Sequence, residues 1–426
     1  VSSPHATLTL KVGQQCCKGQ ACDTGAMLRF AARSSCSRWP QPQTRGNGPP
    51  AGFCRPAAGA CQQKDLHRRC YATVQLSQKR LEEFLAAELH SMAKLGYSTI
   101  TVERILENHT PQRVARVILK ELPARFATRV QQIETTTQDW RKLKGMKELH
   151  NMLFTSFKNL RLVTLKAEWA LSDFTDVITD LRDRHKAVVP LLAECQKSLK
   201  ENRIMDDKSI DEWLMKFMNS RIGTEMLTAH YMSLLTDKDE AHVGIVDTRC
   251  KPARICEEAI AHVKSHFENT KEVEIQLKVE HPDIEFSFIS KYLFIVIEEL
   301  LKNSIIATIK SLRRDKNARK TVRITVCADP GRVGIKISDK GGGVPFELDD
   351  RIWECGYTTT PEDMQSHFQE RTPVSGPGFG LPLCRLYCKY LGGSMNLMSM
   401  PGVGTDIFIF LNRLDAEEQL HSVTQI

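Results

Sequence analysis

The sequence predicts an α+β protein in which an N-terminal α-helical bundle is followed by an α/β sandwich. Between about residues 75 and 235, apolar residues recur at intervals of three and four, and Gly and Pro are rare. This pattern indicates amphipathic helices. Between about residues 245 and 415, segments that alternate apolar with polar residues are interspersed with helical segments, and such alternation indicates half-buried strands. This order of elements predicts helices on one face of an antiparallel-rich sheet.

Residues 1–72 differ from the rest of the chain in charge. They hold ten Lys or Arg residues and two acidic residues, whereas the remaining residues hold 49 of each sign. The balanced body argues against nucleic-acid binding as the main task. The Arg- and Ser-rich stretch after Met27 is typical of mitochondrial transit peptides, and Arg69–Ala72 resembles a matrix-protease cleavage site. We expect a disordered transit leader and a location in the mitochondrial matrix; a Pro- and Gly-rich tail without a signal is the alternative.

The cysteines argue against a zinc-binding or disulfide-stabilised protein, and the longest apolar runs argue against a membrane-spanning one. Seven of the 14 cysteines lie in the leader, and no CxxC pair with zinc-site spacing occurs. A chain of 426 residues buries a sufficient core without disulfides, so we expect free thiols. No run of about 18 uncharged apolar residues occurs, which argues against a membrane-spanning helix.

The helical half is predicted to be a bundle of long helices with short joins. One helix has its apolar face at Val114–Leu122, followed by Pro123, and Phe217–Gly223 is expected to join the last two helices. His185 suggests a phosphorylated histidine, but the order of its neighbours differs from that in sensor histidine kinases. We therefore interpret it as a structural histidine hydrogen-bonded between helices.

In the second half the alternating segments are expected to be strands, and the segments of helical period to be helices. The turn Asp329–Gly331 lies between two alternating segments and predicts a hairpin. Strands are expected at 273–279, 321–328, 333–337, 394–399 and 405–411, and helices at 289–312 and 381–391. The last residues, 416–426, are expected to be a tail.

A carboxylate and a carboxamide lie one turn apart on the longer of these helices. Glu299 and Asn303 are four residues apart, so both project from one helix face. An amide oxygen can ligate Mg²⁺, and a carboxylate can take the proton from a hydroxyl that attacks a γ-phosphate. Alone the pair is a weak signal, because an Asn on a helix is usually solvated or a cap.

Three glycine-rich segments follow further along the chain. Asp339 ends a strand before three glycines, where it can accept from the exocyclic amine of adenine while Gly341 and Gly343 admit a planar ligand. The segment 375–381 opens a helix and frees backbone N–H groups for anions. Thr405 begins the last strand, near the expected base. The polar stretch 357–377 is expected to be a mobile lid over the nucleotide.

These four segments resemble the ATPase family shared by gyrase B, Hsp90, histidine kinases and MutL. The likeness is closer to the mitochondrial 2-oxo-acid dehydrogenase kinases, which comprise pyruvate dehydrogenase kinase and branched-chain α-ketoacid dehydrogenase kinase. The matching segments are Glu299–Asn303, Asp339–Pro345, Tyr357–Pro361, Gly378–Tyr387, Gly402–Asp406, Arg184–Pro190, Ser220–Ile222 and Glu121–Pro123. The resemblance spans roughly residues 75–415 and implies a histidine-kinase/Hsp90-like ATP-binding domain at 245–415, preceded by a regulatory and docking bundle at 75–235.

The resemblance also implies an activity, its cofactors and its partners. Glu299 would be the general base toward a serine of the E1 alpha subunit, and Asn303 would be the Mg²⁺ ligand. Asp339 and Thr405 would recognise adenine. Further nucleotide contacts are implied for Thr358, Thr359, Gly376, Gly378, Phe379, Gly380 and Leu381. ATP, Mg²⁺ and K⁺ are the implied cofactors. The lipoyl domain of the E2 core is the implied docking partner, and a homodimer through the nucleotide-binding half is the implied assembly.

Two positions depart from the family pattern, and the substrate stays open. Ile306 replaces an Arg that the family often carries, and Ile295 replaces the His that pyruvate dehydrogenase kinases place four residues before the base. His242–Ile245 resembles the branched-chain enzyme and Gly378–Tyr387 the pyruvate enzyme. The alternatives are a histidine-kinase-like phosphotransferase and a non-catalytic ATP-binding adaptor. The chain has neither HRD nor DFG, which excludes an ordinary protein kinase.

Overall fold

The computed structural model describes residues 8–14, 70–165, 170–236, 241–266, 272–315, 321–359 and 378–413. Leu8–Gln14 (β1) and Cys70–Leu76 (β2) pair antiparallel and belong to a unit separate from residues 79–426. β1 is a strand within the leader that the sequence predicted to be disordered, and its alternation of Leu8, Leu10 and Val12 suits a strand. The transit leader itself stays a prediction, and the predicted tail lies outside the described residues.

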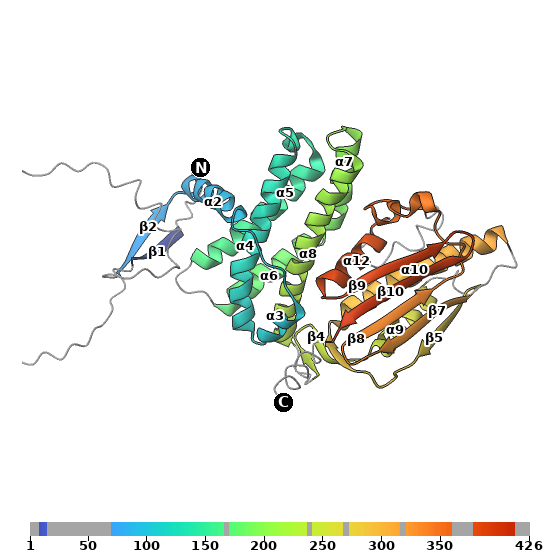
Figure 1. Ribbon diagram of the computed structural model, residues 1–426. Helices are drawn as coiled ribbons and strands as arrows, with labels where there is room; N and C mark the ends of the chain where they lie inside the picture. Colours follow the sequence, from blue (N-terminus) through green and yellow to red (C-terminus); the bar gives the residue numbers. More distant parts are fainter. Residues whose placement is uncertain are drawn as a thin grey trace, which may run out of the picture. The chain divides into compact units, whose positions relative to one another are not determined.

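The helical half consists of long helices joined by short connections (Figure 1). Its helices are α2 (Gln78–Ala93), α3 (Val102–Glu107), α4 (Pro111–Thr136), α5 (Lys144–Leu165), α6 (Leu171–His185), α7 (Val188–Glu201) and α8 (Asp207–Thr236), with a short 3₁₀ helix η1 (Trp140–Lys142). Helix α4 packs against α5 and α8. The buried residues Ile118, Leu122 and Val130 lie on its inward face, and burial of such faces is the main source of helix stability in a bundle.

Pro123 and Gly223 both lie inside helices of this half. Pro123 is buried within α4, which continues to Thr136 because the apolar stripe continues through Ile133. The expectation that Phe217–Gly223 joins two helices is wrong, since the whole segment lies within α8. Gly223 serves close packing instead: a Cβ there would lie 2.6 Å from the guanidinium of Arg125.

The second half is a five-stranded sheet covered by helices on one face (Figure 1). Its strands are β5 (Glu274–Val279), β7 (Thr321–Ala328), β8 (Arg332–Ser338), β9 (Ser394–Met400) and β10 (Gly404–Asn412), in the order β5-β7-β8-β10-β9. Only the β5–β7 pair is parallel among these neighbours. The covering helices are α9 (Pro252–His266), α10 (Ser290–Arg314) and α12 (Gly380–Tyr390). The predicted fold class is therefore confirmed.

The second half also holds elements that the sequence did not predict. Helix α9 is one, and a small sheet of β3 (His242–Val243), β4 (Val246–Cys250) and β6 (Phe286–Phe288) is the other. Two short 3₁₀ helices, η3 (Phe346–Leu348) and η4 (Arg351–Trp353), follow β8. No helix among the described residues is long and apolar enough to cross a membrane.

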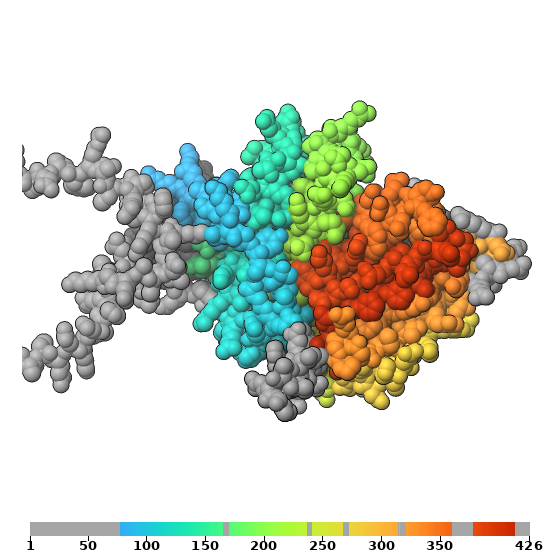
Figure 2. Space-filling view, viewed as in Figure 1, coloured from blue at the N-terminus to red at the C-terminus, as the bar shows by residue number. Residues whose placement is uncertain are grey.

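The core of the second half lies between α10 and the inward face of the sheet. Alternate strand residues such as Ile324, Ile335 and Ile409 are buried, and Leu300 and Ile305 of α10 are also buried. This alternation follows the period-two geometry of a half-buried strand. The other face of β9 and β10 reaches the surface in the space-filling view, where these strands are red (Figure 2).

Candidate active site

Helix α10 carries the acid and the amide that the sequence singled out. Its apolar residues hold it against the sheet, so its polar residues come to lie at fixed positions. Glu299 is mostly buried, with 12% of its side chain exposed, whereas Asn303 one turn later is exposed. The Asn303 carboxamide makes no hydrogen bond within the described part of the chain.

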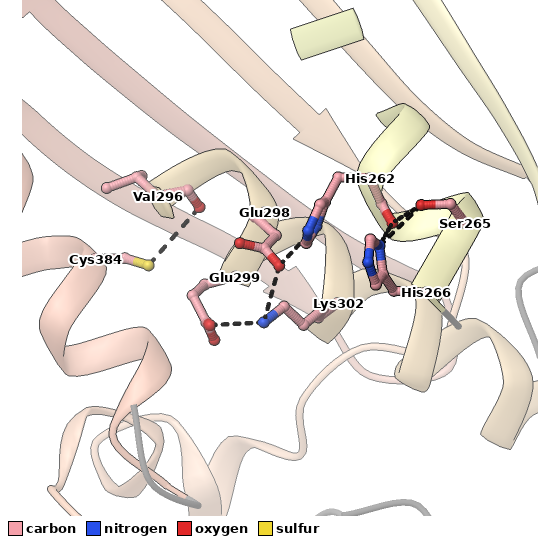
Figure 3. A network of polar contacts seen from close by, with 8 residues as sticks. All are labelled: His262, Ser265, His266, Val296, Glu298, Glu299, Lys302 and Cys384. Atoms are coloured by element: carbon pink, nitrogen blue, oxygen red, sulfur yellow. Dashed lines mark hydrogen bonds and ion pairs between the residues drawn. The ribbon is translucent and has the colours of Figure 1, made fainter. Parts of the chain in front are cut away.

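The two oxygens of the Glu299 carboxylate have different surroundings. Lys302 Nζ donates to Oε1 at 2.8 Å (Figure 3). Oε2 lies beside Gly380, where a Cβ would come within 2.9 Å of it. The structure thus brings Glu299 to the start of α12, which is part of the segment predicted to bind phosphates. Sequence reasoning missed Lys302, although its position three residues after Glu299 on one helix was a usable signal.

The segment of three glycines after β8 also lies against α10. A Cβ on Gly341 would lie 2.6 Å from the backbone carbon of Ala307, which is one turn beyond Asn303. Only a glycine allows this close approach. Gly343 has a φ of +68°. The glycine-rich segment is therefore held close to the helix that carries Asn303.

Asp339 is buried at the end of β8, with 4% of its surface exposed. Its Oδ1 accepts from the N–H of Gly341 at 2.9 Å, and its own N–H donates to the carbonyl of Thr405 at 2.9 Å. Burial raises the pKa of Asp339, although the Gly341 N–H and the Ser304 hydroxyl act to lower it. The buried Ser304 hydroxyl makes no hydrogen bond of standard geometry among the described residues. An acceptor carboxylate beside a buried hydroxyl suits a polar ligand such as adenine.

Thr405 lies beside a serine that sequence reasoning did not single out. The hydroxyls of Thr405 and Ser399 are 3.0 Å apart, and Ser399 also accepts from the N–H of Val344 at 2.8 Å. Ser399 therefore links the glycine-rich segment to the pair β9–β10. Its place opposite Thr405 follows from the antiparallel register of these strands, which local sequence does not reveal.

The remaining predicted residues lie along the loops that border α10. Lys310 Nζ donates to the carbonyl of Thr359 at 2.6 Å, and Thr358 precedes it. Gly378 has a φ of +82°, and its carbonyl accepts from the N–H of Gly356 at 3.0 Å. The remaining described residues of this segment are Phe379, which is buried before α12, and Gly380 and Leu381, which begin α12. Gly376 and the predicted lid at 360–377 lie outside the described residues.

The arrangement provides two kinds of group that suit a magnesium-bound nucleotide. Asn303 presents an unpaired carboxamide, and Mg²⁺ is commonly held by one or two protein ligands together with substrate phosphates. The backbone N–H groups at the start of α12 suit phosphate oxygens. Among the described residues no cluster of three His, Cys, Asp or Glu side chains that would hold a metal alone occurs.

His185 lies away from these groups, within the bundle. Its Nε2 is 2.9 Å from the hydroxyl of Ser156 on α5, which also accepts from Arg184 at 2.9 Å. Burial, followed by the charges of Arg184 and Arg221, lowers the pKa of His185 to about 3. The prediction of a structural histidine hydrogen-bonded between helices is confirmed.

Comparisons with known proteins agree with both halves. Residues 86–247 match the family described as mitochondrial branched-chain alpha-ketoacid dehydrogenase kinase. Residues 288–415 match the histidine kinase-, DNA gyrase B- and HSP90-like ATPase family.

Several curated relatives cover most of the chain. Pyruvate dehydrogenase (acetyl-transferring) kinase isozyme 4 of Rattus norvegicus is 28% identical over 350 residues, which is 78% of this chain and 84% of the relative. Isozyme 3 of Mus musculus is 28% identical over 81% of this chain and 88% of the relative. The pyruvate dehydrogenase kinase of Schizosaccharomyces pombe is 33% identical over 57% of this chain and 60% of the relative. Over both halves, the chain is therefore similar to mitochondrial 2-oxo-acid dehydrogenase kinases.

Proposed function

We propose that this chain is a protein serine/threonine kinase that uses Mg-ATP to phosphorylate, and so inactivate, a 2-oxo-acid dehydrogenase complex in the mitochondrial matrix. The named activity of its relatives and their mitochondrial location support this proposal. The structural observation that carries it is the Glu299 carboxylate, which has one oxygen fixed by Lys302 and the other beside Gly380 at the start of α12. The target within the complex is a serine of the E1 alpha subunit.

In this proposal Glu299 acts as the general base. Oε2 lies beside Gly380 at the start of α12, so we assign to it the proton of the attacking serine hydroxyl. The N–H groups of Gly378–Leu381 bind the phosphate oxygens. Asn303 would hold Mg²⁺, which when bound supplies positive charge that offsets the charge developing on the transferred phosphoryl group.

The nucleotide base and ribose are assigned to the sheet side of the site. Asp339 accepts from the adenine amine, and Thr405, whose carbonyl accepts from the Asp339 N–H, is assigned to the same part of the site. Gly341 and Gly343 leave room for the planar base. Thr358 and Thr359 contact the phosphates and ribose. K⁺ is a further cofactor that we propose by family resemblance alone.

Two partners are proposed beyond the substrate. The helical half would dock the lipoyl domain of the E2 core, as the family resemblance implies. The chain would also form a homodimer through the outer face of its sheet. Met398 and Met400 of β9 are 66% and 62% exposed, and Val403 and Phe410 are exposed nearby. Grouped apolar residues on a surface are typical of interaction sites.

The test offers purified chain and ATP to the E1 subunits of the pyruvate and branched-chain complexes side by side. We expect phosphoserine on one of them, stable to acid and labile to alkali, and the preferred subunit identifies the complex. Glu299→Gln should bind ATP but transfer no phosphate. An acid-labile product would favour a histidine-kinase-like activity, although the hydrogen bond of His185 to Ser156 argues against that residue as acceptor. Nucleotide binding without transfer to either subunit would favour an adaptor.

A further inference from the structure

A network of buried charged residues lies next to Glu299, between α9 and α10 (Figure 3). Glu298 is 3% exposed, and its Oε1 lies 3.2 Å from His262 Nδ1 and 3.4 Å from Lys302 Nζ. Lys302, 5% exposed, lies 2.8 Å from Glu299. The Lys302 ammonium is therefore placed between two carboxylates, one turned toward the candidate site and one turned toward α9.

Because Glu298 and Lys302 are buried, each of these charged side chains needs a partner within the protein. A buried carboxylate is costly unless a cation or donor lies beside it. Lys302 supplies the cation for Glu298, and His262 Nδ1 lies 3.2 Å from the same carboxylate without hydrogen-bond geometry. A lysine side chain alone is long and has several rotamers. With Glu298 on one side and Glu299 on the other, the position of the ammonium becomes defined by both.

The imidazole of His262 is itself held in place. It packs edge-on against Phe294 of α10, with ring centroids 5.6 Å apart, and lies 4.1 Å from the ring of His266 on its own helix. His262 thus packs beside the side of Glu298 that faces α9. The position four residues before Glu299 is occupied by Ile295, which is buried and apolar, so it offers Glu299 no hydrogen bond.

We propose that Lys302 is a positioning residue for Glu299, and that Glu298 and His262 fix Lys302 so that Oε2 of Glu299 stays directed toward Gly380. This inference rests on the proposed role of Glu299 as base. His262 of α9, which is distant in sequence from the site, would thus set the orientation of the Glu299 carboxylate through the buried side chains of Glu298 and Lys302.

The experiment compares Glu298→Gln, His262→Phe and Lys302→Met with the parent chain in steady-state phosphorylation of the E1 subunit. His262→Phe keeps the ring packing and removes the contact to Glu298. Because displacement of a reacting group by about 1 Å costs about 100-fold, we expect kcat to fall about 10- to 100-fold. KM for ATP and the Kd for ADP should stay within about twofold, since none of these residues is assigned to nucleotide contact.

Two further measurements separate positioning from general damage. Lys302→Arg keeps a charged donor and should recover part of the kcat lost in Lys302→Met. The double variant of Lys302→Met with His262→Phe should be no slower than Lys302→Met alone, because the two act through one contact. Glu258→Gln is the matched control, since this carboxylate of α9 is exposed and pairs with Arg254 at 2.9 Å.

The outcomes distinguish this inference from the proposed function. If Glu299→Gln is inactive while His262→Phe and Glu298→Gln both keep the parent kcat, the positioning role is wrong and the base assignment stands. If Glu299→Gln still transfers phosphate, the base assignment itself is wrong. Should the buried Glu298→Gln variant fail to fold, the half-exposed His262→Phe variant decides alone, and additive losses in the double variant also contradict the inference.

Discussion

Gly380→Ala tests whether the base and the phosphate-binding segment meet. A Cβ at this position would lie 2.9 Å from Glu299 Oε2, whereas ordinary contact begins at 3.4 Å. The carboxylate must therefore move by about 0.5 Å, which a side-chain end does at little cost in stability. If displacement by about 1 Å costs about 100-fold, this shift predicts about a tenfold lower kcat.

Gly380→Ala should not lower the stability of the fold. Gly380 is the first residue of α12 and does not have a positive φ. Alanine in a helix is favoured over glycine by up to about 1 kcal/mol, so the melting temperature should stay equal or rise. Steady-state phosphorylation, ADP binding and thermal unfolding are measured on the same sample.

Gly331→Ala is the matched control, because a Cβ there would find its nearest neighbour at 3.6 Å. It should leave kcat at the parent value. A Gly380→Ala variant with unchanged kcat and unchanged stability would refute the reasoning that Oε2 of Glu299 is the working oxygen. A variant that loses ADP binding in parallel with kcat would instead place the defect in the nucleotide site.

Four further predictions concern other parts of the molecule. Asn303→Ala should lose the Mg²⁺-dependent part of ATP affinity, measured by calorimetry with and without Mg²⁺; equal affinities would contradict the ligand assignment. Because burial raises the folded-state pKa of Asp339, its ionisation destabilises the nucleotide-free fold as pH rises through that pKa, so Asp339→Asn should melt higher at pH 7, equally at low pH, and lose ADP binding. Gly223→Ala should lower the free energy of unfolding by about 1–3 kcal/mol in urea titrations, because the Cβ meets Arg125. Met398→Glu should shift the sedimentation of the chain toward monomer with the fold intact.

Much of the second half was predictable because its signals are local. Strand alternation, the Asp329–Gly331 turn and the long apolar helix face are read within a few residues, and the structure has β7, β8 and α10 there. The segment Phe217–Gly223 was misjudged for the opposite reason. Glycine disfavours a helix locally, but here tertiary packing against Arg125 requires it within α8.

The candidate site was predictable by residue type and spacing but not by contact. Glu299 and Asn303 follow from helical geometry, and the glycine-rich segments follow from their composition. The approach of Gly380 to Glu299, and that of Gly341 to Ala307, depend on how α10, α12 and the sheet pack. The contact of His262 with Glu298 joins two helices, and no sequence pattern within either helix predicts this contact.

Helices α7 and α8 of the helical half make hydrogen bonds to the loop at Cys355, which leads to the segment beside Glu299. The Gln196 side chain of α7 donates to the carbonyl of Cys355 at 2.6 Å, and Asp211 of α8 accepts from the Cys355 N–H at 2.6 Å. The next residue, Gly356, donates to the carbonyl of Gly378 at 3.0 Å. Two helices of the bundle thus hold both polar groups of one loop residue, and that loop holds the segment that leads into Gly380. Because each of these bonds depends on the direction of its donor or acceptor, a shift of α7 relative to α8 changes the place of the segment beside Glu299.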